Sequence, residues 1–176
     1  MVTRLVLALA AFIALERIVE LWLAARNRRL MLARGAKEYG QEHYRFVVLL
    51  HAAWFVAWIA EALWRGPRLD QLWPAWLVLF LLAEILRYWC ITTLGVRWNT
   101  RILVVPGELL VHSGPYRFMS HPNYVGVVVD LFAVPMIFNA WITAAVFSVL
   151  NLALLLLVRI PAEEKALKRT EGTQGT

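Results

Sequence analysis

GPYRFMSHPNYVG, at residues 114–126, is a short polar stretch enclosed by long apolar segments. A second polar cluster, RIPAEEKAL at residues 159–167, directly follows the last apolar segment. The two clusters gather side chains that can hydrogen-bond, stack or carry charge: Tyr116, His121, Tyr124, Arg159, Glu163 and Glu164. Because these side chains stand at the polar ends of apolar segments, we expect a site there that faces water on one side and lipid on the other.

The composition is that of a membrane protein. Of 176 residues, 61% are hydrophobic and 17% are charged, with a mean hydropathy of +0.61, whereas soluble domains average about 45–50% apolar and about 25% charged residues. We therefore predict a single membrane domain over residues 1–176. The net charge of +6 comes from basic residues in loops beside apolar segments. This placement predicts contact with membrane lipids and no nucleic-acid partner.

The apolar segments predict an all-α, polytopic bundle of about five transmembrane helices. A span needs about 20 mostly apolar residues, and five stretches qualify: about 2–25, 45–64, 74–94, 123–139 and 140–160. The chain then divides into three N-terminal helices at 1–94, a cofactor-binding part with a terminal helical hairpin at 95–169, and a flexible polar tail at 170–176.

The distribution of basic residues predicts the topology. Lys and Arg are frequent in the loops after the first and third spans and after the last one, and rare in the other loops. By the positive-inside rule, the N-terminus lies outside and the C-terminus lies in the cytoplasm, with the protein in the cell's inner membrane. Both polar clusters then face the cytoplasm.

Residues 95–122 are polar and turn-rich and predict a loop rather than a span. The alternating GELLVHSG at 107–114 predicts a short extended or interfacial segment. Pro122 suits the first turn of a helix, where a missing N–H costs nothing, so His121 is expected at a helix mouth. Further along, Pro161 is expected to break or bend the last span and to start a short helix that carries Glu163 and Glu164.

Two motifs resemble the isoprenylcysteine carboxyl methyltransferase family of integral-membrane enzymes. The first is Ser-Gly-x-Tyr followed by His-Pro-x-Tyr-x-Gly, here within residues 113–126, and the second is Arg-x-x-x-Glu-Glu-x-x-Leu, here at residues 159–167. The chain has Ser120 where family members usually have Arg. The first half, with ERIVEL at 16–21 and RWNTRI at 97–102, resembles a bacterial branch, some members of which are associated with O-methylation of alkylpyrones or alkylresorcinols.

The resemblance implies a cytoplasmic pocket for S-adenosylmethionine, formed by the loop before the fourth span, the terminal hairpin and the C-terminal segment. Aromatic faces suit the donor's adenine and sulfonium groups through stacking and cation–π contacts, and carboxylates suit its ammonium and hydroxyl groups. The residues expected to bind the cofactor are Gly114, Tyr116, His121, Pro122, Tyr124, Glu163 and Glu164, and those expected to act on the reaction are Arg159 and Asp130.

Charged residues inside the expected spans require a separate explanation, since each costs roughly 2.5–3.5 kcal/mol at a helix centre. Pairs spaced i, i+3 can meet on one helix face. We expect these residues either to pair between helices or to line the acceptor pocket, with Asp130 the first candidate for the second role: Glu16, Arg17, Glu20, Glu61, Glu84, Arg87 and Asp130. The histidines show no ligand-like spacing, so no metal site is predicted.

The resemblance, together with these observations, implies an S-adenosylmethionine-dependent O-methyltransferase whose lipophilic acceptor reaches the site from the bilayer. The acceptor carries an acidic oxygen, either an isoprenylcysteine-like carboxylate or an alkylpyrone or alkylresorcinol hydroxyl. Three alternatives remain: an NADPH-dependent sterol-type membrane reductase, a phospholipid N-methyltransferase, and a non-enzymatic membrane subunit or transporter. The sequence leaves the oligomeric state open.

Overall fold

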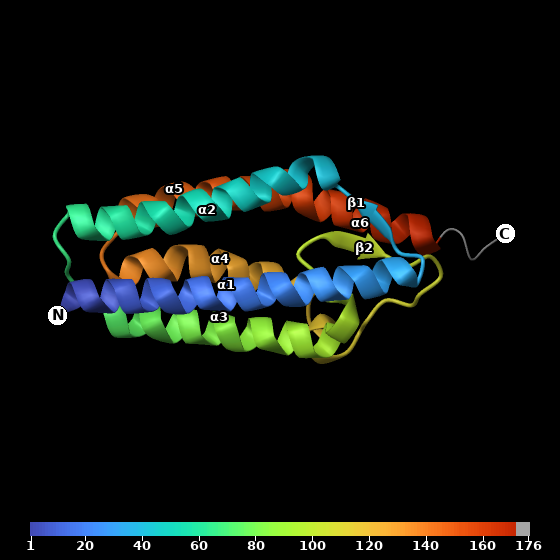
Figure 1. The fold of residues 1–176 in the computed structure, drawn as a ribbon, viewed down its shortest axis with the longest axis horizontal. Coiled ribbons are helices and arrows are strands. Elements are labelled where there is room, and N and C mark those ends of the chain that lie inside the picture. Colours follow the sequence, from blue (N-terminus) through green and yellow to red (C-terminus); the bar gives the residue numbers. More distant parts are fainter. Residues whose placement is uncertain (172–176) are drawn as a thin grey trace.

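The computed structural model describes residues 1–171, with side chains to Lys168, as a bundle of long helices closed at one end by a small sheet (Figure 1). We call this end, where β1, β2 and α6 lie, the loop end. The elements in chain order are α1 (Val2–Ala33), β1 (Lys37–Tyr39), α2 (Gln41–Trp64), α3 (Trp73–Leu94), η1 (Gly95–Arg97), β2 (Ile102–Val104), η2 (Gly114–Arg117), α4 (Pro122–Ile137), α5 (Trp141–Leu154), η3 (Leu155–Arg159) and α6 (Ile160–Glu171). Of the tail expected at 170–176, residues 172–176 lie outside the described part.

The long helices form two groups. Helices α3 and α4 pack closely against each other, with α1 beside them, while α2 lies along α5 (Figure 1). Large aromatic side chains join the groups at the end away from the strands: Trp58 of α2, fully buried, stacks on Phe138 with ring centroids 5.9 Å apart. Trp54 donates a hydrogen bond to the carbonyl oxygen of Leu131 at 3.0 Å. This packing fixes α2 against the end of α4.

Three helical stretches are long and apolar enough to cross a membrane by length and composition: Gln41–Trp64, Trp73–Arg97 and Trp141–Lys168. Helix α4 is apolar but shorter, at 16 residues. Helix α1 is long but carries Glu16, Arg17 and Glu20 among its apolar residues. The predicted all-helical bundle is thus confirmed, three of its five expected spans are long and apolar enough to cross a membrane, and crossing by α1 and α4 stays a prediction.

Helix boundaries at the loop end differ from those expected. Helix α1 continues to Ala33 rather than ending near residue 25, and α2 begins at Gln41 rather than near residue 45. The intervening residues form β1, which pairs antiparallel with β2 in a two-stranded sheet, with Glu38 opposite Leu103. A strand forms at 102–104, where β1 offers a hydrogen-bonding partner, whereas the extended or interfacial segment predicted at 107–114 forms no strand.

The buried carboxylate of Glu38 fastens this sheet to the bundle. It accepts hydrogen bonds from Arg28 at 2.6 and 2.9 Å and from Arg101 at 2.6 Å. Burial raises the pKa of Glu38, but the hydrogen bonds from the two arginines outweigh it and leave the pKa below its usual value. One side chain therefore ties the end of α1 to both strands.

Pro161 does not break the last helix. Residues 141–171 are helical throughout, and the five residues Leu155–Arg159 just before the proline form a π-helical turn. A proline lacks the N–H of a normal helical bond, and its ring clashes with the carbonyl four residues earlier. Because π-helical bonding links residues five apart, the wider turn separates these groups. Of the predicted break or bend, the break is absent and a local change of helix type takes its place, while the predicted short helix with Glu163 and Glu164 is α6.

Gly114, predicted to bind the cofactor, has a backbone conformation that favours glycine. Its φ is +55°, and a Cβ there would lie 2.3 Å from Oγ1 of Thr93 in α3. We expect Gly114→Ala to destabilise the protein by about 1–3 kcal/mol through backbone strain and this collision. Gly35→Ala is the matched control, because Gly35 also has a positive φ, +85°, but nothing lies within 4 Å of its Cβ position. Equal losses of thermal stability in detergent would contradict the importance of the Thr93 contact.

Candidate functional site

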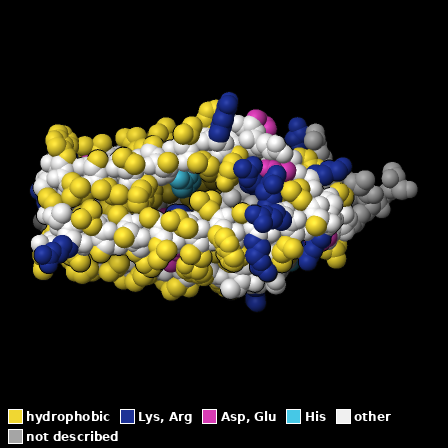
Figure 2. All heavy atoms as spheres, in the orientation of Figure 1, with side chains coloured by type: hydrophobic (Ala, Val, Ile, Leu, Met, Phe, Trp, Pro, Cys, Tyr) yellow, Lys and Arg dark blue, Asp and Glu magenta, His cyan; other side chains and the backbone are white. Residues whose placement is uncertain are grey.

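One cavity of about 510 Å³ runs from the loop end into the apolar part of the bundle. Its walls come from α1, α2, α3, α4 and the α5–α6 helix, and the segment 97–104 covers its loop end. Figure 2 shows a hollow in the apolar face of the molecule, where histidine and basic side chains are visible between hydrophobic ones. The lining is thus polar at the loop end, largely apolar along the sides, and charged at its depth.

At the loop end, three predicted residues form a hydrogen-bonded group. Tyr124 of α4 donates its hydroxyl proton to Glu163 of α6. Arg159 of the π turn donates from Nε to the Tyr124 hydroxyl at 3.2 Å and from Nη2 to the carbonyl oxygen of Thr100 at 2.7 Å. The Nη1 atom of Arg159 is buried and has no hydrogen-bond partner among the described residues. The two motifs, far apart in sequence, therefore meet in one place.

His121 completes this group from the mouth of α4. Its ring stacks on Tyr124 with centroids 5.4 Å apart and planes 21° apart. Its Nδ1 lies 3.9 Å from Glu163, and its Nε2 lies 3.6 Å from Glu164. Tyr116 lines the cavity beside Cys90, and burial, followed by the neighbouring thiol, raises the pKa of its phenol. Its hydroxyl therefore stays protonated and available as a donor.

The segment 97–104, which we call the cover, is held over this end of the cavity by residues that the sequence prediction missed. Asn27 of α1 donates to the carbonyl oxygens of Gly95 and Trp98 at 3.1 and 2.9 Å, and Asn99 donates back to Ala24 of α1 at 2.8 Å. These bonds hold the segment after α3 over the cavity. Asn27 stands in RN at 26–27 and Asn99 in RWNT at 97–100. Their spacing in the sequence gives no sign that these two segments contact each other.

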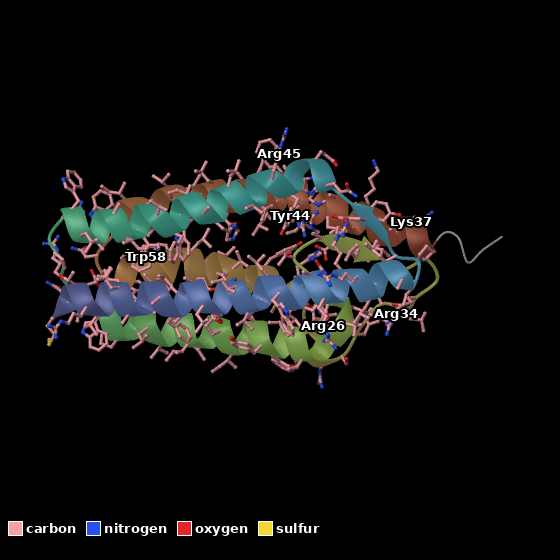
Figure 3. The ribbon with its side chains drawn as sticks, in the orientation of Figure 1. Arg26, Arg34, Lys37, Tyr44, Arg45 and Trp58 are labelled. Atoms are coloured by element: carbon pink, nitrogen blue, oxygen red, sulfur yellow. The ribbon has the colours of Figure 1, made fainter. Side chains whose placement is uncertain are left out.

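Tyr44 and Arg101 form the side of the cover nearest α2. Tyr44 shares a hydrogen bond with the Thr100 hydroxyl at 3.1 Å, and the Arg101 guanidinium lies 4.1 Å from the centre of its ring. In Figure 3, Tyr44 lies on the inner side of α2, toward β2, whereas Arg45 points away from the bundle. Both Tyr44 and Arg101 line the cavity.

At the cavity's depth lies a network of buried charges, which we call the acidic cluster: Glu16, Arg17, Glu20, Glu84, Arg87 and Asp130. Arg87, 2% exposed, contacts Glu84 at 2.9 Å, Glu20 at 3.6 Å and Asp130. Arg17 contacts Glu20 at 2.7 Å. The predicted i, i+3 pairs are both present, and all six residues also line the cavity. Pairing and pocket lining, predicted as alternatives, occur together.

The remaining predicted residues fall outside the cavity lining. Gly114 packs against Thr93, and Pro122 is fully buried at the start of α4. Glu164 borders a separate surface hollow with Lys165 and Lys168 and reaches the site only through His121. Glu61 caps the start of α5 by accepting from the backbone and hydroxyl of Thr143, each at 2.7 Å.

Two bacterial proteins resemble this chain over most of their length. An uncharacterised protein of Bacillus subtilis, YpbQ, is 39% identical over 160 residues, which cover 91% of this chain and 95% of that protein. An uncharacterised protein of Haemophilus influenzae is 26% identical over 152 residues, which cover 86% of this chain and 88% of that protein.

A family model matches residues 76–169, the part of the chain that holds most of α3, both motifs and the π turn. This range covers more than half of the chain and includes the hydrogen-bonded group at the loop end. The chain belongs to the isoprenylcysteine carboxyl methyltransferase (ICMT) family.

Proposed function

We propose that the protein is an integral-membrane methyltransferase that transfers a methyl group from S-adenosylmethionine to a lipophilic acceptor. The observation that carries the proposal is the single cavity, which joins the hydrogen-bonded group of both motifs to an apolar interior. A water-soluble donor and a lipid-like acceptor need such an arrangement, because each must reach the same point from a different solvent. Family membership supports the same activity.

The polar groups at the loop end fit the donor. Three buried polar atoms there have no hydrogen-bond partner among the described residues: Nη1 of Arg159, Oδ1 of Asn123 and Nε2 of His121. An arginine N–H suits the donor's carboxylate, an amide oxygen suits its ammonium or hydroxyl groups, and the stacked rings of His121 and Tyr124 offer a face to adenine. These residues, together with Tyr116 and Glu163, would hold the donor.

In this proposal the protein accelerates the reaction mainly by positioning the acceptor against the donor. When bound, S-adenosylmethionine supplies a sulfonium-activated methyl group, and the protein must hold an acceptor oxygen in line with it at about 3–3.5 Å. Arg159 and Tyr124 fix the loop end through Thr100 and Glu163. Apolar side chains such as Phe55, Val127 and Val134 line the space beneath and exclude water from it.

The acceptor is proposed to reach the cavity from the bilayer between α1 and α2. Both helices contribute apolar lining residues, such as Ile13 and Leu21 from α1 and Val48 from α2. The outer faces beside them expose leucine, valine and tryptophan side chains that suit contact with lipid. No part of this route requires the acceptor to leave the membrane.

The proposed orientation places the loop end in the cytoplasm of the cell and the N-terminus outside, in the inner membrane. In Figure 2, Lys and Arg side chains gather at the end that carries the C-terminus. This asymmetry agrees with the positive-inside rule. In the proposed orientation, the donor-binding residues face the compartment that contains soluble cofactors.

Binding of S-adenosylmethionine to detergent-purified protein, measured by calorimetry, tests the proposal. We expect micromolar binding, weakened at least tenfold by His121→Ala. His112→Ala is the matched control, because His112 is exposed and does not line the cavity. Binding of NADPH in place of S-adenosylmethionine would identify a reductase instead, and binding of neither would point to a non-enzymatic membrane protein.

A further inference from the structure

The loop before α4 exposes several large apolar side chains outside the long helices. Leu109 is 78% exposed, Phe118 is 66% exposed and Met119 is 45% exposed, and Leu110 beside Leu109 is exposed as well. We call these four residues the apolar loop surface. None of them lines the cavity, so the proposed donor site leaves them without a role. Single exposed apolar side chains are common, whereas a continuous group marks contact with a membrane or with another protein.

Phe118 continues the outer face of α3. Its ring contacts that of Trp89, with centroids 6.5 Å apart, and Trp89 is itself exposed, as is Ile85 one turn earlier. In Figure 1, η2, which directly precedes Phe118, lies beside the end of α3. The helical stretch Trp73–Arg97 is long and apolar enough to cross a membrane, and in a membrane its exposed side faces lipid. The lipid-facing side of this span therefore continues onto the loop.

The hydroxyl groups on this side of α3 have partners within the protein. The Thr92 hydroxyl lies 2.9 and 3.1 Å from the carbonyl oxygens of Tyr88 and Trp89, to which it donates. The Tyr88 hydroxyl donates to Glu16 of α1 at 3.0 Å. Polar groups that are satisfied internally need no water and are compatible with lipid. Contact with lipid can therefore extend to the last turn of α3, where the loop begins.

Two arginines border the apolar loop surface. Arg97 donates to the carbonyl oxygen of Leu109 at 2.7 Å and contacts Glu108 at 3.0 Å, which fastens this part of the loop to the end of the α3 span. Arg117 is exposed, and its guanidinium lies 4.6 Å from the centre of the Phe118 ring. It has no carboxylate within 4 Å among the residues that the structure describes. A cation of this kind beside an aromatic ring suits the zone where acyl chains meet phosphate groups.

We propose that the apolar loop surface inserts into the membrane leaflet at the loop end, where Arg117 binds lipid phosphate groups. Continuity with α3 favours lipid over a protein partner, because a water-soluble protein could not cover Phe118 without displacing the lipid beside Trp89. Surfaces of this kind bury their apolar side chains about 5–10 Å into the boundary between head groups and acyl chains. The same loop carries Tyr116, which lines the cavity. Insertion therefore holds one wall of the cavity at the bilayer surface.

Fluorescent labels on introduced cysteines test the insertion. Cys90 is the single native cysteine and is buried, so an NBD label attaches selectively to Leu109→Cys or Phe118→Cys protein in lipid nanodiscs. We expect lipids with a nitroxide near the start of the acyl chain to quench both labels at least about twofold more than a label on Arg34→Cys. Arg34 is the matched control, because it is an exposed polar residue at the same end of the molecule (Figure 3). Quenching by aqueous iodide but not by these lipids would overturn the insertion.

Comparison of phosphatidylcholine nanodiscs with nanodiscs that also contain phosphatidylglycerol measures the contribution of Arg117. The label is placed on Met119→Cys, which also replaces Phe118→Cys if loss of the Trp89 contact prevents folding. We expect the anionic lipid to increase lipid quenching of this label, because a cation at the surface is attracted to an anionic leaflet, and Arg117→Gln to abolish the increase. Arg34→Gln removes an equally exposed arginine and is expected to leave it intact. An increase that persists in Arg117→Gln protein would overturn the phosphate contact.

Loop insertion and methyl transfer are tested separately. The labelling experiments contain no cofactor, so lipid quenching at the loop supports the insertion even in a protein that fails to bind S-adenosylmethionine. Conversely, donor binding by a protein whose loop labels stay in water leaves the methyltransferase proposal standing and removes only the insertion.

Discussion

Replacement of Arg87 by methionine is expected to destabilise the protein by about 3–5 kcal/mol, because it leaves the buried carboxylate of Asp130 without its ion-pair partner. Arg87 is 2% exposed and contacts Glu20, Glu84 and Asp130, so one guanidinium joins α1, α3 and α4. Among the described residues, Arg87 is the one basic side chain within 4 Å of Asp130, whereas Glu20 and Glu84 also contact Arg17, at 2.7 and 3.7 Å. The effect should appear in unfolding by SDS or by heat in detergent.

A lysine at position 87 separates the contribution of the positive charge to stability from that of the guanidinium's geometry. Arg87→Lys retains the positive charge but cannot present several N–H groups in a fixed plane. We expect it to recover part of the lost stability, and the triple variant Arg87→Met, Glu84→Gln, Asp130→Asn to recover more. If Arg87→Met alone were as stable as the native protein, the cluster would have to be neutral without its arginine, and the ion-pair description would be wrong.

The second large effect is expected at Arg159, where substitution by leucine should lower methyl transfer at least about 100-fold. Arg159 donates hydrogen bonds to the Tyr124 hydroxyl and to the carbonyl oxygen of Thr100 at the same time. Its loss would let the cover and the start of α4 move relative to each other, and displacement of reacting groups by about 1 Å can cost roughly 100-fold in rate. Steady-state assays with labelled donor measure this change.

The control for Arg159 is Arg159→Lys. A lysine keeps the charge at the water-facing end of the cavity but can reach only one of the two partners. We expect an intermediate activity and weaker donor binding than in the native protein. Full activity in the lysine variant would show that charge alone matters and that the fixed geometry does not.

Features set by local chemistry could be predicted from the sequence. Apolar segments of about 20 residues identified the long helices, and the turn residues identified the loop at 95–122. The two motifs identified the group at the loop end, since His121, Tyr124, Arg159 and Glu163 do lie together. A site residue was predictable where its chemical type was unusual for its surroundings.

Features that depend on contacts between distant residues could not be predicted. Nothing in KEY or ILV indicates a strand, because each is three residues long and exists only through the other. Glu38 is an ordinary charged loop residue until Arg28 and Arg101 are placed beside it. For the same reason, the position of Gly114 and Pro122 outside the cavity lining could not be predicted from the motif. The asparagines of the cover likewise resemble neutral loop residues in the sequence.

The π turn before Pro161 changes how the last helix must be counted. Asn151 and Glu163 are twelve residues apart, and at about 100° per residue a regular helix would turn them roughly 120° away from each other. The wider turn absorbs about one residue, which reduces the angle to about 20°. Both side chains do line the same cavity. A helical wheel drawn through this segment without that correction would assign the two halves to different faces, and substitutions chosen from it would miss the site.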